Sequence, residues 1–162
     1  MLFPSHDRGG GELNNQELVK ILKEKDNNVL EIKSQHVSPN FLKQQNKDTR
    51  FIIANFIGLS EISKQILQSD KDYIIYEHDH KYVKSRNPAD YKDFIAPKTD
   101  IVNFDFYRKA KAVLCQSNFH AEIVRSNLNL DNIKSVSGNL WSTEILDFMR
   151  DISMRQKILL VL

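Results

Sequence analysis

A cluster of ionisable side chains directly follows one of the apolar runs of the sequence. Residues 73–76 are apolar or aromatic, and Glu77, His78, Asp79 and His80 come next. An imidazole can exchange a proton near neutral pH or hydrogen-bond a hydroxyl group, so His78 is a candidate acid, base or donor, with Asp79 beside it. Two histidines are too few ligands for a metal, and no convincing third is found. The alternative is a polar loop whose histidines make only structural hydrogen bonds.

A run of glycines forms a second candidate site. Gly9, Gly10 and Gly11 precede Glu12 at the predicted start of a helix. Glycines let the backbone approach a ligand closely, and the free N–H groups of a helix start attract anions, so a phosphate or a sugar hydroxyl could bind there. The run lacks the spacing of a dinucleotide-binding motif and the Lys-Ser/Thr of a P-loop. A flexible turn before a helix is the alternative.

Basic residues lie just downstream of the histidines. Lys81, Lys84 and Arg86, with Tyr82 among them, could contact an anionic lipid headgroup or a phosphate-bearing acceptor. With His80 they form a candidate acceptor-binding set. A solvated basic loop is the alternative.

The apolar runs that position these residues are typical of strands in a parallel sheet. They are short, rich in β-branched and aromatic residues, and mostly continuous, as strands covered on both faces are. Leu2-Phe3 looks like the tail of a further strand. Helical patterns separate the runs, so the sequence predicts an α/β fold: a doubly wound, Rossmann-like, mainly parallel sheet with helices on both faces. Ligands of such sheets bind beyond the carboxyl ends of the strands. The predicted strands are residues 29–32, 51–56, 73–76, 112–116, 133–136 and 157–162.

Side chains that can accept a backbone hydrogen bond mark the starts of the helices. Ser60, Thr99, Ser117 and Ser142 are each expected to cap one. We expect the helix after Ser60 to bury Ile62, Ile66 and Leu67. We expect the helix after Ser117 to bury Phe119, Ile123 and Val124 and to turn His120 towards solvent.

Composition limits the remaining choices. The chain has 162 residues, and 23 basic against 21 acidic side chains leave a net charge of +2, which gives no general argument for nucleic acid. The one cysteine, Cys115, lies inside an apolar run, so a buried thiol is expected rather than a nucleophile. No run approaches the roughly 18 apolar residues of a membrane span, and the N-terminus is unlike a signal peptide. We expect a cytoplasmic protein, for which a peripheral membrane contact stays open.

The ordered motifs resemble the N-terminal half of family 4 glycosyltransferases of the GT-B fold. The resemblance begins with the strand tail at residues 2–5 and the glycine run at residues 9–12, and continues with the strand ending in His-Asp at residues 73–79. Residues 110–128, AKAVLCQSNFHAEIVRSNL, are similar to the family's strand and following helix. Residues 132–140, NIKSVSGNL, match the next strand and turn, with Gly-Asn in place of the usual Asn-Gly.

The resemblance implies a retaining transfer of a sugar from a nucleotide-sugar donor to a glycan or lipid-linked acceptor, without a metal or other cofactor. It divides the chain into an acceptor-side domain, residues 1–150, and residues 151–162, an interdomain linker and the first strand of a donor domain whose remainder is missing. On this basis the chain alone is expected to be a poor catalyst or none.

The resemblance also implies roles for single residues. The glycine run with Glu12 would lie near the donor diphosphate. His78 and Asp79 would lie by the transferred sugar. Ser117 and Asn118 would face the same cleft from another strand end.

Two other functions stay open from the residues alone. One is a non-catalytic, truncated module that binds a glycan or a protein. The other is a nucleotide-dependent oxidoreductase, which the sequence disfavours because it lacks the spaced glycine fingerprint with an acidic residue about twenty positions later.

Overall fold

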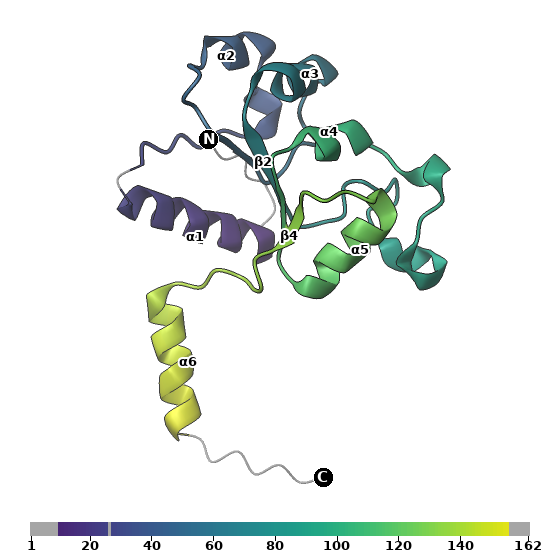
Figure 1. The fold of residues 1–162 in the computed structure, drawn as a ribbon. Helices are drawn as coiled ribbons and strands as arrows, with labels where there is room; N and C mark the ends of the chain where they lie inside the picture. The colour runs from purple at the N-terminus through teal and green to yellow at the C-terminus, as the bar shows by residue number, and fades with distance from the viewer. Residues whose placement is uncertain (1–9, 26, 156–162) are drawn as a thin grey trace.

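A four-stranded parallel sheet lies at the centre of the protein, shown in Figure 1 from a computed structural model that describes residues 10–25 and 27–155. Neighbouring strands pair in parallel in the order β1-β2-β3-β4. This confirms the predicted α/β fold with a parallel sheet. Gly9, the strand tail at residues 2–3 and the predicted strand at residues 157–162 lie outside the described residues. The strands are β1 (Phe51–Ile53), β2 (Tyr73–Glu77), β3 (Val113–Cys115) and β4 (Ile133–Ser135).

Helices cover both faces of the sheet, as alternate strand residues point to opposite sides. On one face, Val19 of α1 packs with Tyr76 and Ala54. On the other face, α3, α4 and α5 pack over the buried residues of all four strands, as in Figure 1, where α1 lies to the left of the sheet and α4 and α5 to its right. The helices are α1 (Gly10–Glu24), α2 (Pro39–Gln44), α3 (Glu61–Asp70), α4 (Phe104–Lys109), α5 (Asn118–Leu128) and α6 (Thr143–Arg155).

Three of the four predicted helix caps are confirmed. The hydroxyl of Ser60 accepts a hydrogen bond from the Ser63 N–H, and that of Ser117 accepts one from the His120 N–H. Ser142 accepts one from the Ile145 N–H at the start of α6. Thr99 caps no helix, because a separate short turn, η4 (Lys98–Asp100), intervenes before α4 begins after Asn103.

Some predictions of buried side chains are wrong at helix starts. Ile66 and Leu67 of α3 are buried as predicted, but Ile62 in its first turn is exposed. Val124 of α5 is fully buried, whereas Phe119 in its first turn is exposed. Periodicity identifies the face that a helix turns to the core, but it does not show which residues at the start of the helix other elements cover.

The predicted strand at residues 29–32 is also wrong. Only Glu31 makes a β-bridge, and Leu30 and Glu31 are exposed. Val29 packs against the α1 side of the sheet and Ile32 against the opposite core. Among the described residues the segment thus makes one β-bridge and no continuous strand, and its side chains reach both faces of the sheet.

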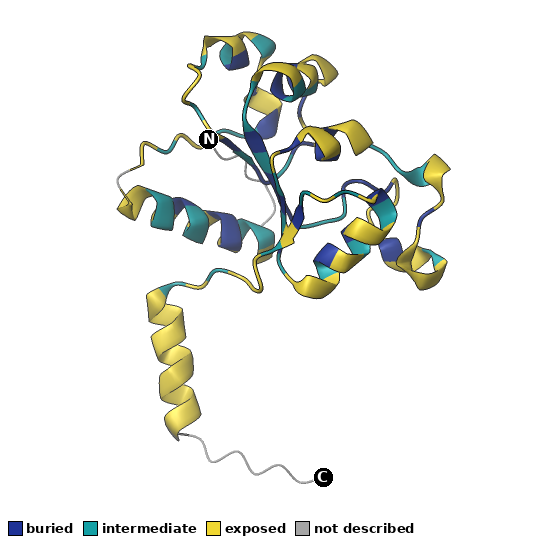
Figure 2. Cartoon of the chain, in the orientation of Figure 1, coloured by how far each residue is buried: buried dark blue, intermediate teal, exposed yellow. Residues whose placement is uncertain are grey.

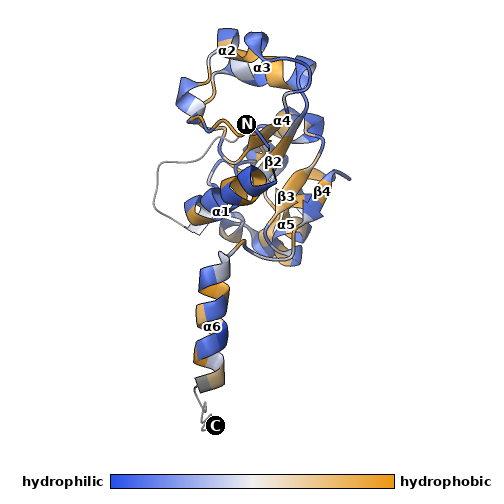
Figure 3. Cartoon of the chain, turned by 90° about the vertical axis from the view of Figure 1, so that its left-hand side faces the viewer, coloured by the Kyte–Doolittle hydropathy of each residue, from blue (hydrophilic) through white to orange (hydrophobic). Residues whose placement is uncertain are grey.

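Helix α6 projects from the body of the protein, and Figure 2 shows it exposed along its length. Its apolar side chains Ile145, Phe148, Met149 and Ile152 follow helical spacing and form one stripe. Figure 3 shows hydrophobic and hydrophilic positions alternating along α6. The domain boundary predicted after residue 150 falls inside α6. Within residues 10–25 and 27–155, no helix has both the length and the apolar character needed to cross a bilayer.

Candidate functional site

The carboxyl ends of β2 and β3 bring the predicted polar residues to one edge of the sheet. Glu77, the last residue of β2, pairs in register with Cys115, the last residue of β3. His78 directly follows β2, so it lies beside the segment that leads from the end of β3 to Ser117, just before α5. Because α1 runs antiparallel to the strands, its first turn lies at the same edge.

Gly11 allows α1 to approach the end of β2 closely. A Cβ atom at Gly11 would lie 3.3 Å from Cγ of His78, which is a tight contact. Gly10 has no such neighbour, since a Cβ there would meet nothing within 4 Å. The predicted meeting of the glycine run and the histidine segment is thus confirmed for Gly11.

His78 is held by α1 and by its own strand. Its Nε2 lies 3.0 Å from Oδ1 of Asn15, and its ring packs edge-on to Tyr76. An amide oxygen only accepts hydrogen bonds, so the shared proton belongs to Nε2 and Nδ1 is left as an acceptor. This Nδ1 is buried and has no hydrogen-bond partner among residues 10–25 and 27–155. Burial, followed by the positive charge of Lys81, lowers the pKa of His78 to about 4, so the ring is neutral at pH 7.

Two buried asparagines join α1 to the rest of this edge, and the sequence analysis missed both. Oδ1 of Asn14 accepts hydrogen bonds from the Tyr76 hydroxyl at 2.6 Å and from the Leu140 N–H at 3.2 Å. Its Nδ2 donates to Oδ1 of Asn139 at 2.8 Å. Each of these asparagines lies four residues before an apolar residue of α1, Asn14 before Leu18 and Asn15 before Val19. Two polar residues on the inward face of an amphipathic helix are the sequence feature that could have identified them.

Glu77 is the buried anchor of the loop that carries the histidines. One carboxylate oxygen accepts from the Asp79 N–H at 2.9 Å and from Nζ of Lys81 at 3.3 Å, and the other accepts from the Tyr107 hydroxyl. Burial alone would raise the pKa of Glu77, but Lys81, Tyr107 and the Asp79 N–H together lower it to about 2. The carboxylate is therefore ionised throughout the physiological pH range.

Lys81 does not belong to an exposed basic patch, which corrects the sequence-based assignment. Its side chain is 1% exposed and pairs with Glu77, itself 0% exposed, and with Asp79 at 3.4 Å. Its ammonium group is therefore held in these ion pairs inside the protein and is not presented to an anionic ligand. Lys84 and Arg86 are exposed but form ion pairs with Asp100 at 3.4 Å and Asp79 at 2.5 Å.

His120 faces the site, although the sequence analysis predicted it to face solvent. Its ring centroid lies 4.3 Å from that of His80. Nδ1 of His80 lies 3.1 Å from the Tyr82 hydroxyl, and Nε2 of His120 is buried without a partner in the part of the chain that the structure describes. Burial, followed by the neighbouring His120, lowers the pKa of His80 to about 4, and burial also lowers that of His120.

Three of the four buried side-chain polar atoms without a hydrogen-bond partner in the described part of the chain lie at this edge of the sheet, and the fourth is Oδ1 of Asn132, which directly precedes β4. Besides His78 and His120, Oε2 of Glu12 in the first turn of α1 is buried with no hydrogen-bond partner. Buried polar atoms are normally satisfied, so such atoms indicate where a ligand or water binds. Ser117 and Asn118 lie exposed at the start of α5, and the Ser117 hydroxyl is occupied by its cap.

Two further observations concern the cysteine and the side chains that could bind a metal. Burial raises the pKa of Cys115 to about 12, so its thiol stays protonated and is a poor nucleophile. Among the described residues, no group of three His, Cys, Asp or Glu side chains could hold a metal ion.

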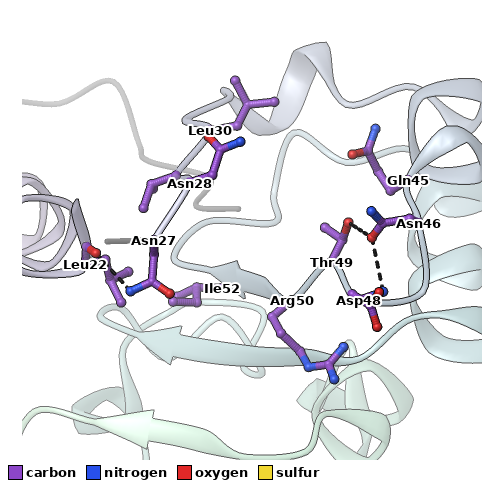
Figure 4. A pocket seen from close by; sticks show the side chains of 11 residues that line it. Leu22, Asn27, Asn28, Leu30, Gln45, Asn46, Asp48, Thr49, Arg50 and Ile52 are labelled. Carbon is purple, nitrogen blue, oxygen red and sulfur yellow. Dashed lines mark hydrogen bonds between the residues drawn. The ribbon is translucent and has the colours of Figure 1, made fainter. Parts of the chain in front are cut away.

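A pocket of about 510 Å³ lies at the opposite edge of the sheet (Figure 4). Thr49 and Arg50, which line it, directly precede β1, and Leu22 lies near the C-terminal end of α1. Oδ1 of Asn46 there accepts hydrogen bonds from the Thr49 hydroxyl and the Asp48 N–H. Parallel sheets bind their ligands beyond the carboxyl ends of the strands, so we place the functional site at that end and not in this pocket.

No protein-family model, curated protein or solved structure matches this chain.

Proposed function

We propose that the protein is the acceptor-side half of a GT-B glycosyltransferase of the family 4 type, and that sugar hydroxyl groups bind where α1 meets the end of β2. The observation that carries the proposal is the pair of buried, unpartnered oxygen and nitrogen atoms there, Oε2 of Glu12 and Nδ1 of His78. The motif resemblance at residues 9–12, 73–79 and 110–140 supplies the reaction class.

The chemistry of these two atoms favours hydroxyl groups over a phosphate as their immediate partners. A carboxylate oxygen accepts hydrogen bonds, and so does Nδ1 of His78 when Nε2 carries the proton. Two hydroxyl groups of a sugar can each donate to one of these atoms, whereas an ionised phosphate only accepts. The low pKa of His78 keeps the ring neutral, so it offers a lone pair and not a positive charge.

The same site leaves a place for an anion beside the sugar. The first N–H groups of α1, at Gly10 and Gly11, have no partners within the helix, and the helix dipole favours negative charge at this end. In the proposed reaction these groups stabilise the leaving diphosphate of a nucleotide-sugar donor, as preorganised donors do for developing charge. Most donor contacts would come from a second domain.

Binding of free sugars tests the site directly. Saturation-transfer NMR with glucose, galactose, mannose and N-acetylglucosamine is expected to detect binding of at least one. His78→Ala removes one hydrogen bond and is expected to weaken that binding about threefold to tenfold with little loss of folding. Asn46→Ala, in the pocket at the opposite edge, is the control and should leave binding unchanged. Equal binding by His78→Ala would remove His78 from the site.

Sugar transfer is tested separately, by measuring how much of a sugar nucleotide is consumed. UDP-glucose, UDP-galactose and GDP-mannose are offered to the chain together with any downstream domain of its gene. Consumption that falls in the His78→Ala variant supports the glycosyltransferase. Sugar binding without consumption of any donor by the folded protein would favour a non-catalytic glycan-binding module instead.

A further inference from the structure

Three apolar side chains form a contiguous exposed patch beside the candidate site. Phe94 is 40% exposed, Ile95 46% and Phe119 60%. The rings of Phe94 and Phe119 meet edge-to-face with centroids 5.8 Å apart, although they come from different elements, η3 (Lys92–Phe94) and α5. We call these three residues the aromatic patch. Single exposed apolar residues are common on proteins, but two aromatic rings packed together on the surface are a feature to explain.

The backbone holds Phe94 on the surface in a strained conformation. Asp93 and Phe94 both have positive φ angles, 54° and 59°, which are costly for side chains larger than glycine. Asn127 of α5 secures this turn, since its Nδ2 donates to the Phe94 carbonyl and its Oδ1 accepts from the Ala96 N–H, both at 2.8 Å. A side-chain clamp that holds a strained, outward-facing phenylalanine is a reason to look for a partner of that ring.

Two exposed lysines flank the patch. Lys92 and Lys98 lie two residues before Phe94 and three after Ile95. Within the described part of the chain, neither ammonium group forms an ion pair, in contrast to Lys84 and Arg86 nearby. Lys92 and Lys98 lie close in sequence to the exposed rings and outnumber the one exposed carboxylate between them, Asp93. Uncommitted ammonium groups beside exposed aromatic residues match the surface of an anionic bilayer, where rings enter the interface and lysines meet headgroups.

We propose that the aromatic patch, with Lys92 and Lys98, docks the protein on the surface of a membrane that contains anionic lipids. Phe119 precedes His120, whose ring contacts His80, so docking would bring the carboxyl edge of the sheet to the lipid surface. The contact is peripheral, through a few side chains. The proposal does not depend on sugar transfer and is tested without any sugar.

The test is co-sedimentation of the full chain with lipid vesicles. The wild-type protein is expected to bind vesicles of phosphatidylcholine mixed with phosphatidylserine, and to bind phosphatidylcholine alone more weakly. The double variant Phe94→Asn, Phe119→Ser is expected to lower the partition coefficient at least about tenfold, the equivalent of about 1.4 kcal/mol. Asparagine tolerates a positive φ, so position 94 keeps its backbone conformation. The double variant Lys92→Gln, Lys98→Gln is expected to lower binding to the anionic vesicles about tenfold or more. Its weaker binding to vesicles of phosphatidylcholine alone should stay unchanged.

Phe148→Ser on α6 is the matched control, because Phe148 is 65% exposed and also lies in an apolar stripe. Its binding should equal that of the wild type. Loss of binding in this variant but not in the Phe94, Phe119 variant would assign membrane contact to α6 and overturn the proposal. Absence of vesicle binding by the folded wild-type protein would also overturn it. So would a dimer, seen by analytical ultracentrifugation, that the Phe94, Phe119 variant dissociates, since the patch would then cover a second copy.

Discussion

Replacing the buried carboxylate of Glu77 by an amide is expected to destabilise the protein by about 3 kcal/mol at pH 7. The pKa of Glu77 lies at about 2 instead of the ordinary 4.5. At about 1.4 kcal/mol per pKa unit, ionisation favours the folded state by about 3 kcal/mol. In Glu77→Gln, Lys81 keeps only the half-exposed Asp79 as a counter-charge. Removing one partner of a buried ion pair commonly costs about 3–5 kcal/mol, which agrees in size.

The pH dependence has a definite direction. Because the pKa of Glu77 is lower in the folded protein, its contribution is complete above about pH 4.5 and is lost as the pH falls towards 2. The difference in free energy of unfolding between wild type and Glu77→Gln should therefore be largest near pH 7 and shrink towards pH 2.

Urea denaturation followed by far-UV circular dichroism measures this difference at several pH values. The double variant Glu77→Gln, Lys81→Met is the internal control. It removes both buried charges and should recover most of the lost stability, since replacing a whole buried pair is often neutral. The reasoning is refuted if Glu77→Gln stays within about 0.5 kcal/mol of wild type at pH 7, a typical effect of an unimportant surface change. A loss that is the same at pH 3 as at pH 7 would refute it equally.

Three further predictions concern the same edge of the sheet. Gly11→Ala should weaken sugar binding measured by NMR, because its Cβ crowds His78, whereas Gly10→Ala, which meets nothing within 4 Å, should leave binding unchanged and raise the melting temperature. The free energy of unfolding should fall as the pH drops from 6.5 towards 4, because burial lowers the pKa values of His78 and His80 and protonation then favours the unfolded chain; histidine NMR titration should give both pKa values near 4. Ser117→Ala should lower the free energy of unfolding by about 1 kcal/mol in urea denaturation, because α5 loses its cap.

Local patterns predicted most of the architecture. Strands β1 to β4 and the starts of α3, α5 and α6 lie where apolar runs and capping serines indicate them, because both signals act within a few residues. The strand prediction for residues 29–32 was wrong because it also relied on a signal only a few residues long. A short apolar run looks like a strand whether it pairs along its whole length or, as among the described residues here, through a single β-bridge.

The candidate site was predictable in position but not in its contacts. A parallel sheet places all carboxyl strand ends together, so His78 and Gly11 could be expected at one edge. Lys81 could not be assigned in the same way. In a polar loop a lysine is usually solvated, and here it is buried because Glu77 pairs with its ammonium group and the ring of Phe56, from a distant part of the chain, lies against it.

The sequence by itself determined the succession of strands and helices, the parallel sheet and the edge that carries polar residues, since these depend on periodicity, capping and chirality along short stretches of chain. Only the tertiary structure decided which polar groups are satisfied and which are left open. Asn15 reaches His78 across 63 positions of sequence, and Tyr107 reaches Glu77 across 30. Such partners depend on how whole helices pack on the sheet. Hence the proton position on His78, the burial of Lys81 and the inward turn of His120 appear only once the chain is folded.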